Sequence, residues 1–120
     1  MTDEGGLRGR RLLVVEDDYF LAEAIAGGLA AAGAEVVGPV GTIDDALDLL
    51  EATAQLDGAV LDLNLHGEMA FPVADSLMEL RVPFVFATGY DKAVIPTRFA
   101  GVRRCEKPVD ACRIGQALFG

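Results

Sequence analysis

Five short runs of apolar and β-branched residues alternate along the chain with segments of helical periodicity, and this alternation constrains the fold most strongly. The runs are nearly continuous in apolar character, as expected of parallel strands that are buried on both faces. Strand–helix units of this length imply right-handed crossovers and helices on both faces of the sheet. The sequence therefore predicts one doubly wound, five-stranded parallel sheet, with strands over residues 11–16, 35–38, 58–63, 83–87 and 102–105.

Helices are predicted between these strands, where apolar residues recur every three or four positions. The first helix, over residues 19–32, is expected to end at Gly33. The second begins at Thr42, which with Asp45 has the spacing of a capping box in which Asp replaces the usual Glu. Two further helices are predicted, over residues 71–80 and over the segment that carries Ala111, Ile114 and Leu118.

The connection between the fourth and fifth strands, residues 91–101, is the least regular part of the pattern. Pro96 lies in its middle, where it would remove a helical hydrogen bond and clash with the preceding turn. We therefore expect a short or irregular fourth helix here. Residues 1–9 are predicted to be a flexible lead, and residues 10–120 a single domain without repeats or linkers.

Charge and composition exclude several classes of protein. The net charge is −9, which argues against direct binding of nucleic acid, because such binding requires clustered Lys and Arg. No uncharged stretch approaches the length of a membrane span, and the first ten residues do not resemble a secretory signal. Cys105 and Cys112 match no metal-binding spacing and are predicted to be free thiols, mostly buried. These features together predict a cytoplasmic location.

Polar residues follow the predicted strands at the edge where doubly wound sheets bind their ligands. They are Glu16, Asp17 and Asp18 after the first strand, Asp62 and Asn64 after the third, Thr88 after the fourth, and Lys107 after the fifth.

These residues fit one kind of chemistry. Glu16, Asp17 and Asp62 would repel one another unless a cation lay between them or one bound a proton. A few oxygen ligands with room for water and phosphate oxygens suit Mg²⁺. Phosphoryl transfer to Asp62 would then need mainly positioning and electrostatics. The Thr88 hydroxyl and the Lys107 ammonium can each bind a phosphate oxygen.

Each residue also has an ordinary structural interpretation when it is taken alone. Asp18 suits the N-cap of the first helix, and Asp62 suits a turn or cap at a strand end. Thr88 before a glycine suits a turn, and Lys107 before Pro108 suits the approach to a helix. His66 is expected to be a solvent-facing loop residue. The functional interpretation is preferred because four strand ends each supply a group that fits the same chemistry.

Four motifs in this order resemble those of response regulator receiver domains, the signalling modules of two-component systems, over roughly residues 10–120. They are residues 12–18, 60–64, 86–90 and 106–108. The resemblance implies a flavodoxin-like strand order, 2-1-3-4-5. It also implies that Asp62 is the phosphoacceptor, and that the magnesium ligands are the side chains of Glu16, Asp17 and Asp62 and the backbone carbonyl of Asn64.

The same resemblance implies that Thr88 is the switch hydroxyl and that Lys107 is the phosphate-pairing lysine, with a cis bond to Pro108. Residues 86–90 resemble the Phe-x-Thr-Gly-Tyr motif of a receiver subgroup with many stand-alone members, common in alphaproteobacteria. Two positions depart from the commoner pattern. Glu16 replaces the more usual Asp, and Arg104 lies where many receivers have a switching Tyr or Phe.

The function implied is transfer of a phosphoryl group from a histidine kinase or phosphotransfer protein to the chain, followed by changed contacts with an unknown protein target or with a second copy. Such a domain catalyses only its own phosphorylation and dephosphorylation. Alternatives remain open: a phosphate sink, a pseudo-receiver that is never phosphorylated, and a phosphohydrolase of the haloacid dehalogenase type. A flavodoxin-type cofactor binder is disfavoured because Glu16, Asp17 and Asp18 would repel a phosphate.

Overall fold

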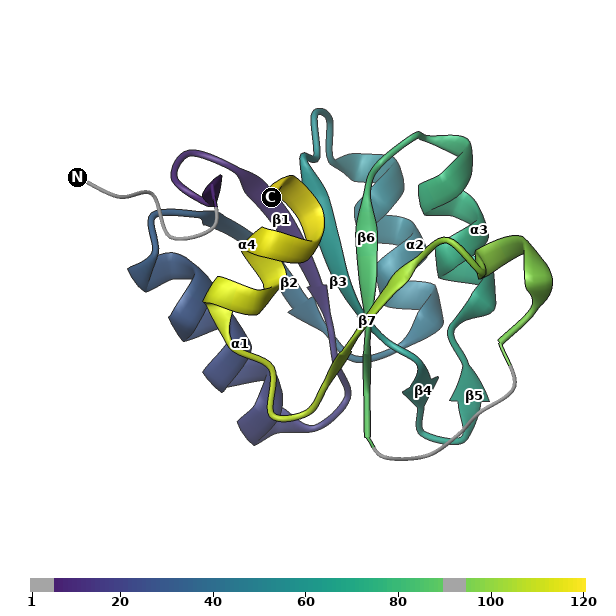
Figure 1. Cartoon of the computed structure of the whole chain (residues 1–120). Helices are drawn as coiled ribbons and strands as arrows, with labels where there is room; N and C mark the ends of the chain where they lie inside the picture. Colours follow the sequence, from purple (N-terminus) through teal and green to yellow (C-terminus); the bar gives the residue numbers. More distant parts are fainter. Residues whose placement is uncertain (1–5, 90–94) are drawn as a thin grey trace.

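The structure of the chain is a computed structural model that describes residues 6–89 and 95–120. Its five-stranded sheet is parallel, with the order β2-β1-β3-β6-β7 (Figure 1). This order confirms the predicted doubly wound, flavodoxin-like topology. The strands are β1 (Arg11–Val15), β2 (Glu35–Val40), β3 (Gly58–Asp62), β6 (Phe84–Thr88) and β7 (Arg103–Glu106).

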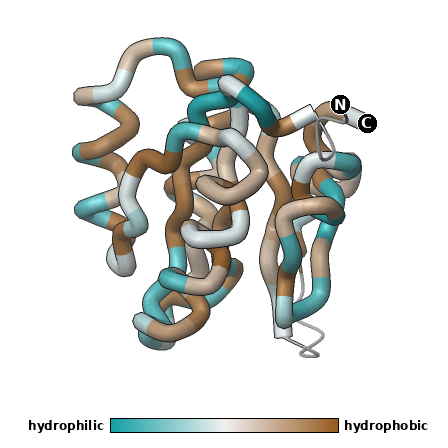
Figure 2. The backbone as a smooth tube through the Cα atoms, turned by 90° about the vertical axis from the view of Figure 1, so that its left-hand side faces the viewer, coloured by the Kyte–Doolittle hydropathy of each residue, from teal (hydrophilic) through white to brown (hydrophobic). Residues whose placement is uncertain are grey.

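Helices cover both faces of the sheet. Helices α1 (Tyr19–Ala31) and α4 (Ala111–Phe119) pack on one face, whereas α2 (Ile43–Ala52) and α3 (Phe71–Glu79) pack on the other. Figure 2 shows that hydrophobic segments concentrate in the interior, between the flanking layers. No helix in residues 6–89 and 95–120 combines the length and the apolar character that crossing a bilayer requires.

Alternation along the strands divides the core into two clusters. In β1, Leu13 and Val15 point towards α2 and α3, and Leu12 and Val14 point towards α1 and α4. All four side chains are at most 1% exposed. The strands are thus apolar on both faces, which places polar side chains at the strand ends rather than within the sheet.

Three helices begin with a side-chain cap that the sequence supplies. The Asp18 carboxylate accepts a hydrogen bond of 3.1 Å from the Leu21 N–H, and the Thr42 hydroxyl accepts one of 3.0 Å from the Asp45 N–H. Asp110 caps α4 in the same way. The predicted N-cap role of Asp18 and the start of α2 at Thr42 are therefore confirmed.

The packed part of the chain begins before the first strand, earlier than predicted. Leu7 is fully buried against the α1 and α4 side of the core, and the Gly9 N–H donates to the Gly33 carbonyl at 2.9 Å. Residues 6–9 thus pack as part of the domain, although they were expected within the flexible lead. Residues 1–5, the rest of that lead, lie outside the described residues.

Strand β2 was predicted to end at Gly38, before Pro39, and this prediction is wrong. The strand continues to Val40, with a shift in its register against β1. Gly38 has φ of +94°, and a Cβ there would lie 3.0 Å from the Val14 carbonyl oxygen. Strand β2 lies at the edge of the sheet, and an edge strand tolerates a proline. The glycine and the proline thus occupy a local irregularity rather than the end of the strand.

In residues 95–102, the described part of the connection from β6 to β7, the helical structure is one 3₁₀ turn, η2 (Thr97–Phe99), in agreement with the predicted short or irregular fourth helix. Phe99 is 1% exposed and packs between Phe71 and Phe86, with ring centroids 5.6 and 5.8 Å away. Residues 90–94 of this connection lie outside the described residues. Both cysteines are free, but Cys112 is exposed, so the expectation of burial holds only for Cys105.

Candidate functional site

A pocket of about 480 Å³ lies at the carboxyl ends of four strands, β1, β3, β6 and β7. Parallel topology brings these ends to the same edge of the sheet, as predicted from the sequence. The residues predicted to form the site all line this pocket: Glu16, Asp17, Asp62, Asn64, Thr88 and Lys107. The structure therefore brings together every residue of that set.

Three carboxylates define the floor of the pocket. Glu16 follows β1 and is 3% exposed, while Asp62 ends β3 and is 5% exposed. Asp17 is only partly buried, and one oxygen from each of the three side chains lies within 4.8 Å of the others. Carboxylates this close and this poorly hydrated repel one another, so the site favours a cation.

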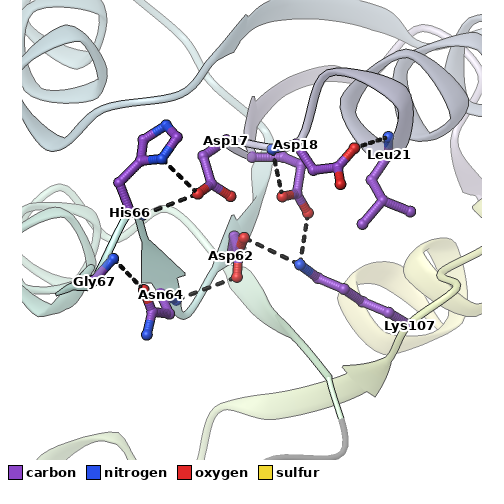
Figure 3. Close-up of polar contacts among 9 residues, drawn as sticks. Asp17, Asp18, Leu21, Asp62, Asn64, His66, Gly67 and Lys107 are labelled. Carbon is purple, nitrogen blue, oxygen red and sulfur yellow. Dashed lines mark hydrogen bonds and ion pairs between the residues drawn. The ribbon is translucent and has the colours of Figure 1, made fainter.

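The ammonium group of Lys107 lies between two of these carboxylates (Figure 3). Its Nζ is 2.9 Å from Glu16 Oε1 and 3.0 Å from Asp62 Oδ2. The main chain directly after β7 fixes this approach, because the Lys107 N–H donates to the Thr88 carbonyl at 2.8 Å. The bond between Lys107 and Pro108 is cis, as the resemblance implied.

One ammonium does not neutralise the cluster. Burial, together with the neighbouring Asp62, raises the pKa of Glu16 to about 7. Burial alone would lower the pKa of Lys107, but contacts with Glu16 and Asp62 outweigh it and raise that pKa. Glu16 Oε1 also accepts no well-directed hydrogen bond from the described residues, although the Lys107 charge lies close to it. The pocket thus retains an excess of negative charge.

A small hairpin covers the acidic cluster from the β3 side. Strands β4 (Asn64–Leu65) and β5 (Glu68–Met69) are joined by His66 and Gly67, whose φ values of +52° and +87° fit a type I′ turn. The His66 N–H donates to Asp17 Oδ2 at 2.9 Å, and its Nδ1 lies 3.4 Å from the same oxygen. The bond from His66 lowers the pKa of Asp17, although burial acts in the opposite direction.

Asn64 connects this hairpin to the end of β3. Its N–H donates to Asp62 Oδ1 at 3.2 Å, and its side-chain oxygen accepts from the Gly67 N–H at 2.8 Å. His66 is a solvent-facing loop residue, as predicted, with a side chain that is 71% exposed, but its contact with Asp17 was not predicted. The His66-Gly67 pair, between two short polar–apolar dipeptides, was the available signal for this hairpin.

The residues present fit a magnesium ion. All the candidate ligand atoms are oxygens, and the open pocket leaves space for water and phosphate oxygens beside them. Glu16 Oε2 already accepts from the Asp18 N–H at 3.1 Å, which orients that carboxylate. The unsatisfied negative charge described above would be offset by a divalent cation.

Thr88 and Gly89 form the opposite wall. Thr88 ends β6 and is 9% exposed, and a Cβ at Gly89 would meet no heavy atom within 4 Å, so this side of the pocket is open. Arg104 pairs in register with Phe86 of β6, is exposed and does not line the pocket. Of the two positions that depart from the commoner receiver pattern, Arg104 is therefore outside the site, whereas Glu16 is part of it.

Comparison with solved structures identifies the class of protein. SdrG from Sphingomonas melonis Fr1 is 34% identical, with a TM-score of 0.80 over 92% of this chain and 93% of SdrG. The BeF3-activated conformation of SdrG, from Pseudomonas melonis Fr1, is 32% identical, with a TM-score of 0.73 over 98% of this chain and 96% of SdrG. A response regulator receiver protein from Sinorhizobium medicae WSM419 shares the fold, with 22% identity and a TM-score of 0.75 over 93% of each chain.

The chain therefore belongs to the response regulator receiver domain family. It is similar to SdrG in particular, over nearly the whole length of both chains. No family model matches the sequence, and a search of curated proteins finds no match either. The assignment thus rests on the solved structures, and it agrees with the arrangement of the pocket.

Proposed function

We propose that this chain is a phosphoacceptor receiver, in which Asp62 takes a phosphoryl group from a phosphohistidine of a histidine kinase or phosphotransfer protein. The observation that carries the proposal is the pocket itself. Carboxylates from β1 and β3 come within 4.8 Å of one another, and the Lys107 ammonium lies 3.0 Å from Asp62. Few other uses explain three clustered carboxylates, two of them buried, that open on a pocket able to hold a phosphoryl group.

Magnesium is the cofactor in this proposal. Glu16, Asp17 and Asp62 would hold it through their side chains, and Asn64 through its backbone carbonyl. When bound, the ion supplies positive charge to the oxygens of the phosphoryl group and to the acidic cluster. The hairpin contributes by fixing Asp17, since the His66 N–H occupies one carboxylate oxygen and leaves the other available.

The residues of the chain then have distinct roles. A carboxylate oxygen of Asp62 forms the new phosphorus–oxygen bond as the phosphorus–nitrogen bond of the donor breaks, and the donor imidazole leaves with the bonding pair and takes up a proton. Lys107 exchanges its contact with Asp62 for a phosphate oxygen, because the Asp62 carboxylate loses its negative charge when it becomes an acyl phosphate, whereas the phosphate oxygens carry charge. The Thr88 hydroxyl donates to another phosphate oxygen from the opposite wall.

The new phosphate adds charge and acceptor oxygens, and this changes the contacts that the domain makes with protein partners. We include in the proposal a stand-alone role of the kind found in the Phe-x-Thr-Gly-Tyr subgroup, with contacts to a target protein or a second copy. Tyr90 of that motif lies outside the described residues. We place the reaction in the cytoplasm, where free thiols such as Cys105 and Cys112 remain reduced.

The test uses acetyl phosphate with MgCl₂ and intact-mass spectrometry. We expect the wild type to gain the mass of one phosphoryl group and Asp62→Asn to gain none. Asp48→Asn, the same chemical change on the exposed face of α2, is the matched control and should react as the wild type does. An unmodified wild type, or an equal gain in Asp62→Asn, would overturn the proposal.

A further inference from the structure

The charge of the chain is distributed unevenly. Residues 95–120 carry five basic and two acidic side chains, whereas residues 6–89 carry four basic and fourteen acidic ones. The C-terminal segment forms η2, β7 and α4, and β7 is the edge strand opposite β2 (Figure 1). An acidic protein thus has one basic edge.

Three arginines gather around a hollow on this edge. Arg103 and Arg104 of β7 and Arg113 of α4 line a pocket of about 300 Å³. All three are exposed, and none of their side chains forms an ion pair or hydrogen bond with any residue in the described ranges. Glu106 is the acidic residue in the lining. Arginines elsewhere are engaged: Arg11 pairs with Glu35, and Arg98 with Asp75.

An apolar groove continues from this hollow. It has a volume of about 410 Å³ and shares Arg103 and Ala117 with the arginine-lined pocket. Apolar side chains from α3, β6 and α4 dominate its lining, among them Met78, which is 45% exposed. We call the two hollows together the β7 edge surface. It therefore combines unpaired guanidinium groups with an adjoining apolar surface.

We propose that the β7 edge surface binds an acidic segment of a partner protein, with carboxylates on the arginines and an apolar residue in the adjoining groove. Guanidinium groups bind carboxylates through paired hydrogen bonds, and arginine is less strongly hydrated than lysine. Nucleic acid and anionic membranes present the same sign of charge, but over a larger area. The other acids of a chain with net charge −9 would repel such extended surfaces. A short segment meets mainly the local charge, since salt screens charges beyond about 8 Å.

The probe is a fluorescently labelled peptide of four Glu-Glu-Leu repeats, and binding to the unphosphorylated protein without Mg²⁺ is followed by anisotropy. We expect salt-sensitive binding, weaker by about tenfold in Arg104→Glu and in Arg113→Glu. Arg8→Glu makes the same charge change in the turn before β1 and should weaken binding by less than about twofold. A peptide of Glu-Glu-Ser repeats should bind more weakly than the Glu-Glu-Leu peptide, because it lacks the apolar anchor.

The inference would be overturned by no binding to the wild type, by equal losses in Arg8→Glu and Arg104→Glu, or by tighter binding of a Lys-Lys-Leu peptide. Tighter binding to a single-stranded oligonucleotide or to phosphatidylserine vesicles would assign the surface to a different partner and reject an acidic protein segment. Salt-sensitive self-association, measured by sedimentation, would make a second copy the occupant and likewise reject the proposal. Thermal unfolding confirms that each variant is folded. None of these measurements depends on phosphorylation of Asp62.

Discussion

The interior of the sheet and the pocket at its carboxyl end are both buried, yet they contribute to stability in opposite directions. Leu77 and Phe86 are fully buried among apolar neighbours, and each such side chain stabilises the folded state. Glu16 and Asp62 are almost as well buried, but they are charged groups of the same sign that share one ammonium. Burying such a cluster costs free energy that the apolar core must offset.

The apolar core therefore supplies the stability that keeps the acidic pocket folded. The clusters on the two faces of the sheet hold the strand ends in fixed positions, and the strand ends hold carboxylates together against their repulsion. An active pocket of this kind is expected to be a local weak point that a well-packed scaffold tolerates. Substitutions in the two regions should therefore differ in size and, for one carboxylate, in sign.

The largest loss of stability is expected in the core. Leu77→Ala removes a fully buried side chain from the α2 and α3 side and should lower the free energy of unfolding by about 2–5 kcal/mol. Leu80→Ala, the same change at a site that is 57% exposed, should cost less than about 1 kcal/mol. Urea unfolding measures both. Equal costs would mean that burial of this helix face does not dominate its stability.

Lys107→Ala is expected to have the next largest effect. It leaves Glu16 and Asp62 buried without their cation, so the metal-free protein should lose about 1–3 kcal/mol. Addition of Mg²⁺ should restore part of the loss, because a second source of positive charge then serves the same carboxylates. Urea unfolding with and without MgCl₂ tests this. Absence of any recovery would argue against a cation site at the cluster.

Asp17→Asn should weaken Mg²⁺ binding by about tenfold or more, with little change in stability. The amide oxygen can still accept the hydrogen bond from the His66 N–H, so the hairpin should keep its position. Isothermal titration calorimetry gives the affinity. Asp48→Asn, on the exposed face of α2, serves as the control for the lost charge. An unchanged affinity in Asp17→Asn would contradict the proposed ligand set.

Features that depend on regular sequence patterns could be predicted from the sequence, and features that depend on local irregularities could not. The parallel sheet and the site residues followed from apolar runs, four of which end in a polar group, because parallel topology brings those ends to one edge of the sheet. The strand order was predicted from the resemblance to receiver domains. Periodicity carries no information about two-residue strands, so the β4–β5 hairpin was missed. Its turn has His66 in a position where Asn is the usual residue.

Two other differences arise from tertiary contacts. Leu7 is an isolated apolar residue in a polar stretch, and its burial depends on a space between α1 and α4 that no local pattern reveals. Strand β2 passes through Pro39 because it lies at an edge, and edge position is a property of the whole sheet. The position of Lys107 between Glu16 and Asp62, rather than on one of them, was likewise not available from spacing.

Glu16→Gln should stabilise the metal-free protein, whereas Leu77→Ala in the core should destabilise it. The raised pKa of Glu16, to about 7, means that its ionised form is less stable in the fold than in water. At pH 8 without metal, the neutral amide should therefore stabilise the protein by about 1 kcal/mol, while Mg²⁺ affinity falls. Its amide oxygen can retain the hydrogen bond from the Asp18 N–H. A destabilised variant would show that the Lys107 pair outweighs the repulsion.

The smallest effect concerns an ion pair outside both regions, between Asp75 of α3 and Arg98 of η2, at 2.8 Å. The Arg98 guanidinium lowers the pKa of Asp75 below its usual 3.8. A carboxyl whose pKa is lower in the folded state stabilises the fold above the unfolded pKa, and this contribution disappears as the pH falls through the folded value. The stabilisation should be slight, because water screens an exposed pair.

Asp75→Asn should therefore lower the urea midpoint slightly at pH 6, and the difference from the wild type should vanish well below pH 3.8. Arg98 lies over the Phe99 ring, 4.5 Å from the centroid, and this contact should persist in the variant, so the comparison isolates the carboxylate. Asp48→Asn controls for the loss of one surface charge. A difference in urea midpoint that persists at low pH would mean that packing, rather than charge, causes the effect. A large difference at pH 6 would mean that this exposed ion pair stabilises the protein as much as the Lys107 contacts in the buried pocket do.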